Sequence, residues 1–380
     1  MTLALEGLRV LDLSRLYPGP YCSMILADFG AQVLCVEDRR FAGEPSMPSA
    51  MRNKRHMTLN LKSGEGRAVF ARLARGADVV LEGFRPGVAA RLGVDYETLS
   101  RENPGLVYCS VTGYGQTGPL RDLVGHDVNY LALGGLLAGT GSSPAAPPAI
   151  PGTQVADVAA GGMNAALGIL LALLAPERTG RGQWVDVAML DGIVGMMGYA
   201  ASLWFGLGER VARGDSMLTG RWPWYRVYRC ADGRYLSIGA VERRFWKTLC
   251  EALGRPEWAD AQYDAARAAE MHAFFEARFA EKSRDDWFAA LRGLEVCVAP
   301  VLEADEALAS EHVRARGLVV ETRAPGGGSQ RVLGVPIRLS ATPGRVATPP
   351  PAFGEHTDAV LAELGYAPEA IERLRREGVV

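Results

Sequence analysis

The first half of the chain alternates short apolar runs with segments of helical periodicity. Residues 19–27 and 64–74 repeat apolar positions every three to four residues, and the turn-forming residues 62–64 open the second segment. The apolar runs are rich in β-branched residues and lie at residues 8–13, 32–36, 78–81 and 106–111. Strands that alternate with helices are typical of a parallel sheet, so the pattern predicts a doubly wound, Rossmann-like α/β fold.

A change of composition marks a second, smaller domain. A continuous apolar helix is predicted for residues 190–205, and residues 220–228 after it are charged and aromatic. Asp232 and Gly233 predict a β-hairpin turn, because Asp-Gly supplies the positive φ that a tight turn needs. Helical patterns follow over residues 242–253, 264–282 and 283–294. We therefore expect a large α/β domain over residues 1–205 with a C-terminal return at 330–380, and a small α+β domain over residues 220–320.

Composition excludes several classes of protein. The chain has 380 residues, of which 48% are hydrophobic, so it can bury a large core without disulfide or metal staples. Its 41 Lys and Arg residues against 43 Asp and Glu leave a net charge of −2, which argues against nonspecific nucleic-acid binding. The six cysteines are scattered, without metal-ligand spacing, and indicate reduced thiols in a cytoplasmic protein with no metal site.

No membrane segment is expected. The first residues carry an early acidic residue and lack the basic and apolar regions of a signal peptide. The most apolar window, residues 158–175, is interrupted by Asn164 and by glycines, and Asp157 precedes it. A buried core helix explains this window better than a membrane span.

His126 is the first residue that could carry chemistry. It follows a loop rich in Gly and Pro and stands where an apolar helix begins. Unpaired N–H groups and the positive end of the helix dipole would stabilise a developing anion there and favour the neutral, basic imidazole. Position alone leaves open that His126 is an ordinary residue at a helix start.

Two carboxylates stand in similar positions. Asp157 begins the hydrophobic helix, where it is either an N-terminal residue favoured by the helix dipole or a catalytic carboxylate whose pKa the apolar surroundings raise. Glu242 follows the second strand of the predicted hairpin, and taken alone it is a helix-start residue.

Together these residues resemble a known family. The sequence is similar to the alpha-methylacyl-CoA racemases of the family III CoA transferase superfamily, from Leu8 to near the C-terminus. The motifs that carry the resemblance are DVVLEGFRPG at 78–87, TGYGQTGP at 112–119, GHDVNY at 125–130, the Asp157 segment, and GRGQWVD at 180–186.

The resemblance implies a reaction and its residues. In the racemases, a His and an Asp flank the α-carbon of a 2-methylacyl thioester; one removes the α-proton and the other returns a proton to the opposite face of the enolate. Transferred to this chain, the two bases are His126 and Asp157, with Glu242 in support and the N–H of Asp127 facing the enolate oxygen. The substrate is acyl-CoA, no cofactor beyond its coenzyme A is implied, and relatives form an interlocked homodimer.

A different reaction remains as an alternative. Transferases of the same superfamily use the residue that corresponds to Asp157 as a nucleophile, which forms an anhydride and then an enzyme thioester. They usually carry an aromatic residue where this chain has His126, and several have a glycine run where this chain has residues 239–244. These differences favour the racemase. An inactive CoA-binding relative is a third class, and the intact set of His126, Asp157 and Glu242 argues against it.

The resemblance also assigns contacts to coenzyme A. This chain departs from the family pattern at two places. The expected phosphate-binding Arg after the second strand corresponds to Arg39, with Arg40 as the alternative register. Bulky Arg221 and Trp222 stand at the start of the small domain, where they either line the acyl pocket or pack in the domain hinge. The other assigned residues are Leu59, Asn60, Leu61, Gly83, Phe84, Arg85, Arg91, Gly125, Asp127 and Tyr130.

Overall fold

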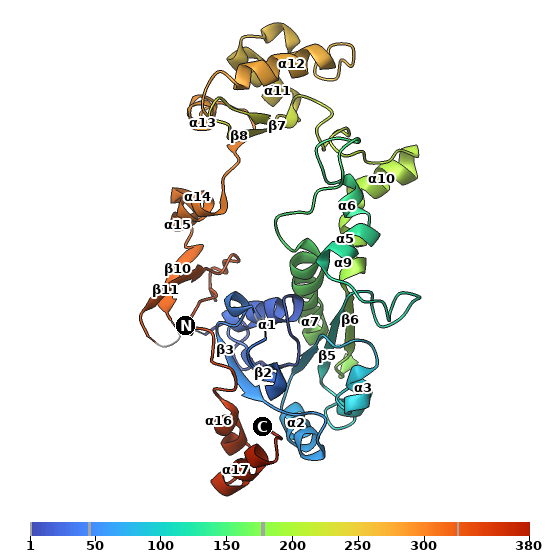
Figure 1. Cartoon of the computed structure of the whole chain (residues 1–380), viewed down its shortest axis with the longest axis vertical. Coiled ribbons are helices and arrows are strands. Elements are labelled where there is room, and N and C mark those ends of the chain that lie inside the picture. Colours follow the sequence, from blue (N-terminus) through green and yellow to red (C-terminus); the bar gives the residue numbers. More distant parts are fainter. Residues whose placement is uncertain (1, 45–46, 176–178, 325–326) are drawn as a thin grey trace. The chain divides into compact units, whose positions relative to one another are not determined.

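The chain folds into two compact units. The structure is a computed structural model (Figure 1) that describes residues 2–44, 47–175, 179–324 and 327–380. The large unit comprises Met1–Gly134, Thr153–Met196 and Glu311–Val380, and the small unit comprises Gly135–Gly152 and Met197–Ser310. These limits differ from the expected ones, because the chain returns to the large unit at Glu311 and the segment Gly135–Gly152 joins the small unit.

A six-stranded sheet forms the centre of the large unit. All neighbouring strands are parallel, which confirms the doubly wound α/β fold. The strand order reverses on either side of β1, and ligands bind at such a switch point beyond the carboxyl ends of the strands. In spatial order the strands are β3 (Lys54–Thr58), β2 (Gln32–Glu37), β1 (Arg9–Asp12), β4 (Val79–Glu82), β5 (Val107–Thr112) and β6 (Trp184–Ala188).

Helices cover both faces of this sheet because successive strand side chains point to opposite sides. Val10 belongs to the core on the side of α1 (Pro18–Asp28) and α7 (Asn164–Leu174). Leu11 belongs to the opposite core, with α2, α16 and α17. These three helices span Gly64–Arg75, Thr357–Glu363 and Pro368–Arg376.

Local signals explain where the helices begin. Pro18 stands in the first turn of α1, where its missing N–H costs no hydrogen bond. The Ser63 side chain accepts the Gly66 N–H at 2.9 Å and caps α2, where the turn-forming residues predicted a helix start. Shorter elements complete the large unit: η1 (Arg39–Phe41), η2 (Pro48–Ala50), α3 (Val88–Leu92), α4 (Tyr96–Leu99), α5 (Asp127–Leu133), the π-helix η3 (Ala156–Met163), α9 (Met189–Met196), α15 (Glu311–Ala315), β10 (Val319–Arg323) and β11 (Ser329–Leu333).

The small unit has its own core. An antiparallel sheet packs against three helices, and aromatic side chains such as Trp224, Trp246 and Phe275 fill the space between them. The sheet has the order β7 (Tyr225–Arg229), β8 (Tyr235–Gly239), β9 (Val298–Pro300). The helices of this unit are α6 (Leu136–Gly139), α10 (Gly198–Leu207), α11 (Arg243–Leu253), η4 (Pro256–Trp258), α12 (Ala268–Phe279), α13 (Arg284–Leu291) and α14 (Ala304–Ala309).

Several elements differ from the sequence predictions, and strand β6 (Trp184–Ala188) lies where no strand was expected. The single helix expected at 190–205 is two helices, α9 and α10, separated by a break at Met197. Strand β3 was missed, because it begins Lys54-Arg55-His56 and does not read as an apolar run. The structure buries Lys54 completely and gives its ammonium the Pro20 carbonyl at 2.8 Å and the Ser23 hydroxyl at 2.6 Å.

Only one side of the apolar stretch Ala156–Leu174 packs into the core. Ala165 and Ile169 are buried in the core between α7 and the sheet, as expected for this segment. Leu167, Leu171 and Leu174 on the other side are 56–65% exposed. By length and composition alone the stretch could span a membrane, and the buried side shows that it also packs as part of the α/β core.

Candidate active site

His126 stands immediately before α5 and is held there by its own helix. Its backbone is extended, and its N–H donates to the Asn129 side chain at 3.0 Å. The Tyr130 hydroxyl donates to the Gly125 carbonyl at 2.6 Å, and burial raises the pKa of Tyr130 to about 12, which keeps this hydroxyl a donor. Gly125 is required here, since a Cβ would lie 2.7 Å from the Tyr114 hydroxyl. Gly125 and Tyr130 therefore fix the backbone that carries His126.

Asp157 lies beside this helix start. It is the second residue of η3, and its N–H donates to the Asp127 carboxylate at 3.0 Å. The pKa of Asp157 is raised to about 6, mainly by burial and also by the neighbouring negative charge of Asp127, while the proximity of His126 acts to lower it. The structure thus brings His126, Asp127 and Asp157 together. The carboxyl group of Asp157 titrates close to neutral pH.

Glu242 belongs to the small unit. It is the residue that precedes α11, where its backbone carbonyl accepts the Trp246 N–H at 3.0 Å and its side chain is exposed. Its charge contributes, after burial, to raising the pKa of the nearby Cys297 thiol. The large unit by itself therefore holds two of the three expected catalytic residues, and the small unit holds the third.

A cavity of about 480 Å³ opens at the carboxyl ends of β1, β2 and β4. We call it the carboxyl-edge cavity. Six residues assigned to coenzyme A by resemblance line it, namely Leu59, Leu61, Gly83, Phe84, Arg85 and Arg91. It also has an excess of positive charge, since its basic residues Arg15, Arg40, Lys62, Arg85 and Arg91 face only two acidic ones, Glu37 and Asp38. Such a cavity suits a ligand with several phosphates.

Five assigned residues lie outside this cavity. Arg40 lines the cavity and Arg39 does not, because the two occupy successive positions of the short helix η1. Asn60 shapes a turn: its side chain accepts the Lys62 N–H at 3.0 Å and donates to the Gly378 carbonyl at 3.3 Å. Gly125, Asp127 and Tyr130 lie at the start of α5, with His126. The resemblance thus marks two places in the large unit, the cavity and the α5 start.

Arg15 is a cavity residue that the sequence analysis missed. Its guanidinium carbon lies 3.6 Å from the centre of the Phe41 ring, and the group pairs with Glu37 at 3.1 Å and Glu44 at 2.9 Å. The signal that could have found it is its place just after β1, in one of the loops where ligands bind in such sheets.

Buried Glu82 orders the loop that lines the cavity. Its carboxylate accepts the Phe84 N–H at 2.6 Å, directly beyond the end of β4. Burial raises the pKa of Glu82 to about 7, although its hydrogen bond to Ser110 opposes this shift. Glu82 therefore acts on the cavity through the backbone of Phe84.

The hypothesis that Arg221 and Trp222 line an acyl pocket finds no support within the small unit. Arg221 pairs with Asp215 at 3.3 Å, and Trp222 stacks on Trp224 with ring centres 6.3 Å apart. Tyr263 completes this aromatic group, and the Trp224 ring is fully buried. These contacts match the alternative in which the aromatic residues pack as structure.

Matches to known proteins cover nearly the whole chain. The family model described as CoA-transferase family III matches residues 5–357. The human alpha-methylacyl-CoA racemase is 38% identical over 384 residues, which cover 100% of this chain and 98% of the relative. The mouse succinyl-CoA:glutarate CoA-transferase is 33% identical over 99% of this chain and 90% of the relative. The crystal structure of a CAIB/BAIF family protein from Brucella suis superposes with a TM-score of 0.82 at 30% identity, covering 96% of this chain and 100% of that one.

Proposed function

This chain belongs to CoA-transferase family III, and we propose that it is a racemase that interconverts (R)- and (S)-2-methylacyl-CoA by α-proton transfer. The observation that carries the proposal is the grouping of His126 and Asp157 at the start of α5, with the pKa of Asp157 raised to about 6. A carboxyl group that titrates near neutrality can serve both as an acid and as a base. The similarity to the human racemase over the full chain supports the same reaction.

In the proposed reaction the two side chains exchange roles. One base takes the proton from the α-carbon, the C–H electron pair moves into an enolate of the thioester, and the other residue donates a proton to the opposite face. The reverse reaction begins with the two residues in the opposite protonation states. We propose that the N–H of Asp127 faces the enolate oxygen and that Glu242 has the supporting role that the resemblance gives it.

Proton exchange separates this function from a CoA transferase. Purified protein is incubated with an enantiopure 2-methylacyl-CoA in deuterated water, without a free carboxylic acid. We expect deuterium at the α-carbon together with loss of optical purity, because each turnover returns a solvent proton. No exchange, followed by CoA transfer when a carboxylic acid is added, would instead make Asp157 a nucleophile and overturn the proposal.

The carboxyl-edge cavity is proposed to hold the phosphates of coenzyme A. Replacing Arg91, which lines it, with Gln is expected to raise KM for the acyl-CoA by roughly ten- to a hundredfold, since a charged hydrogen bond contributes roughly 1.5–3 kcal/mol. The kcat should change little, because this contact is the same in the ground state and the transition state. Arg101→Gln, an exposed position outside the cavity, is the matched control. An unchanged KM in the Arg91 variant would place coenzyme A elsewhere.

We also propose a cytoplasmic homodimer. The exposed apolar side of α7, formed by Leu167, Leu171 and Leu174, supports self-association, because such a surface is unfavourable in water. Its members lie three to four residues apart, so they form one stripe along the helix. Sedimentation equilibrium is expected to give twice the mass of the chain, and a monomer at micromolar concentration would contradict this proposal.

A further inference from the structure

A second cavity lies at the opposite edge of the large sheet. It has a volume of about 880 Å³ and is lined at the amino-terminal ends of the strands by Arg9, Gln32 and Lys54. We call it the amino-edge cavity. It shares no lining residue with the carboxyl-edge cavity, because Leu13, Val36 and Gly83 line the latter at the other ends of the strands. The proposed racemase reaction makes no use of this space.

The floor of the amino-edge cavity is apolar. Leu11 and Leu34 come from the sheet, Leu73 from α2, and Val360 from α16, with Leu364 just beyond it. These side chains belong to the α2 side of the core or pack against it. A volume of this size falls within the usual range for small-molecule sites, and the side chains named at its floor are apolar.

The rim carries guanidinium groups that have no carboxylate partner. The Arg9 guanidinium donates to the Gly76 carbonyl at 3.4 Å. The Arg72 guanidinium donates to the Leu364 carbonyl and lies 4.8 Å from the centre of the Tyr366 ring. Neither guanidinium forms an ion pair within the part of the chain that the structure describes, so both charges remain uncompensated.

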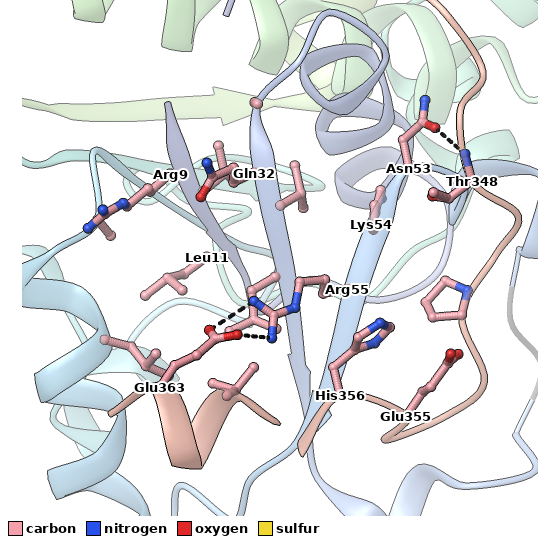
Figure 2. Close-up of a pocket in the computed structure, with 18 of the residues that line it drawn as sticks. Arg9, Leu11, Gln32, Asn53, Lys54, Arg55, Thr348, Glu355, His356 and Glu363 are labelled. Carbon is pink, nitrogen blue, oxygen red and sulfur yellow. Dashed lines mark hydrogen bonds and ion pairs between the residues drawn. The ribbon is translucent and has the colours of Figure 1, made fainter. Parts of the chain in front are cut away.

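A third guanidinium at the rim already holds a carboxylate. Figure 2 shows Arg55 reaching from β3 to Glu363 of α16 through two parallel hydrogen bonds, of 2.9 and 2.8 Å. The side chains are 39% and 60% exposed, so this pair contributes little to stability. A ligand carboxylate can therefore replace Glu363 on Arg55 at small cost.

We propose that the amino-edge cavity is a second ligand site, which binds a free carboxylic acid with an extended apolar body. The carboxylate lies at the rim among Arg9, Arg55 and Arg72, and the hydrocarbon body covers the leucines of the floor. Guanidinium groups match the planar carboxylate in both charge and geometry. This proposal goes beyond the racemase function and does not depend on it.

Calorimetry with decanoate tests the site in the full-length protein. The protein is first saturated with 2-methyldecanoyl-CoA, so that the proposed active site and its acyl region are occupied. We expect decanoate still to bind, and decanol, which lacks the charge, to bind at least tenfold more weakly. Absence of decanoate binding, or its displacement by the acyl-CoA, would overturn the proposal.

Three variants separate this site from nonspecific binding. The double variant Arg9→Gln and Arg72→Gln is expected to weaken decanoate binding at least tenfold. Arg75→Gln is the matched control, since Arg75 lies on the same helix but pairs with Glu102 outside the cavity. Glu363→Gln should strengthen binding several-fold by freeing Arg55, a gain that damage to the fold cannot produce. Wild-type affinity in the double variant, or no gain in the Glu363 variant, would refute the site.

Discussion

Asp157→Asn is expected to lower the rate of α-proton exchange by about two to four orders of magnitude, the usual contribution of a general acid or base. Asparagine keeps the shape of the side chain and leaves the backbone N–H free to donate to Asp127. It cannot accept or release a proton near neutral pH. Mass spectrometry of the acyl-CoA after incubation in deuterated water measures the rate. His126→Ala should cause a loss of similar size, because each turnover needs both residues.

Exposed Asp122 provides the control for this experiment. It lies in the loop before His126 with its side chain 83% exposed, and Asp122→Asn should retain full exchange. Retention of exchange in Asp157→Asn would contradict the two-base mechanism. A His126→Ala variant that moved CoA between carboxylic acids would identify a transferase.

The free energy of unfolding of Asp157→Asn shows whether the variant loses activity through its chemistry or through damage to the fold. The folded-state pKa of Asp157 is raised from 3.8 to about 6, so between these values the folded state binds more protons than the unfolded state. The free energy of unfolding therefore falls as pH rises from about 4 to 6, and the charged carboxylate is unfavourable above that range. After allowance for the partial exposure of the group, asparagine should stabilise the protein by about 1 kcal/mol at pH 7.5 and by less at pH 4. An inactive variant that is at least as stable as the wild type has lost chemistry and not its fold.

Strands β1, β2, β4 and β5 were predictable because they are largely buried on both faces. Their apolar runs stand out from the amphipathic helices, and Ser63 and Pro368 mark helix starts through local chemistry that needs no tertiary contact. Strand β3 was not predictable in this way, since tertiary partners alone make its buried Lys54 acceptable. The break between α9 and α10 had only glycines such as Gly195 and Gly198 as local signals, and the surrounding sequence is mostly apolar.

The candidate site was predictable for a different reason. Composition and spacing identified His126 and Asp157 only as residues at helix starts, and the resemblance joined them into one reaction. Neither source showed the hydrogen bond from the Asp157 N–H to Asp127, which depends on how η3 and α5 pack. The cavity contact of Arg40 in place of Arg39 likewise depends on the turn of η1. Residue types could thus be anticipated, whereas the fine geometry required the fold.

The pH dependence of exchange gives the most specific test of this geometry. In either direction the reaction needs one proton on the pair of His126 and Asp157, so the two enantiomers react with enzyme forms that carry the same number of protons. Because the equilibrium constant between the enantiomers does not depend on pH, kcat/KM for both should follow one profile, with an inflection near pH 6 where Asp157 titrates. The absence of this inflection would remove Asp157 from the pair.

Asp127→Asn should move that inflection to lower pH. The substitution removes the negative charge that adds to the raised pKa of Asp157, and the amide oxygen of asparagine can still accept the Asp157 N–H. Burial is the larger cause and remains, so the inflection should stay above 3.8 and shift by only part of the difference between 3.8 and 6. Profiles of kcat/KM for Asp127→Asn and Asp122→Asn give the comparison, with the second variant expected to keep the wild-type inflection. If both variants keep the wild-type inflection, the group that titrates there is not Asp157.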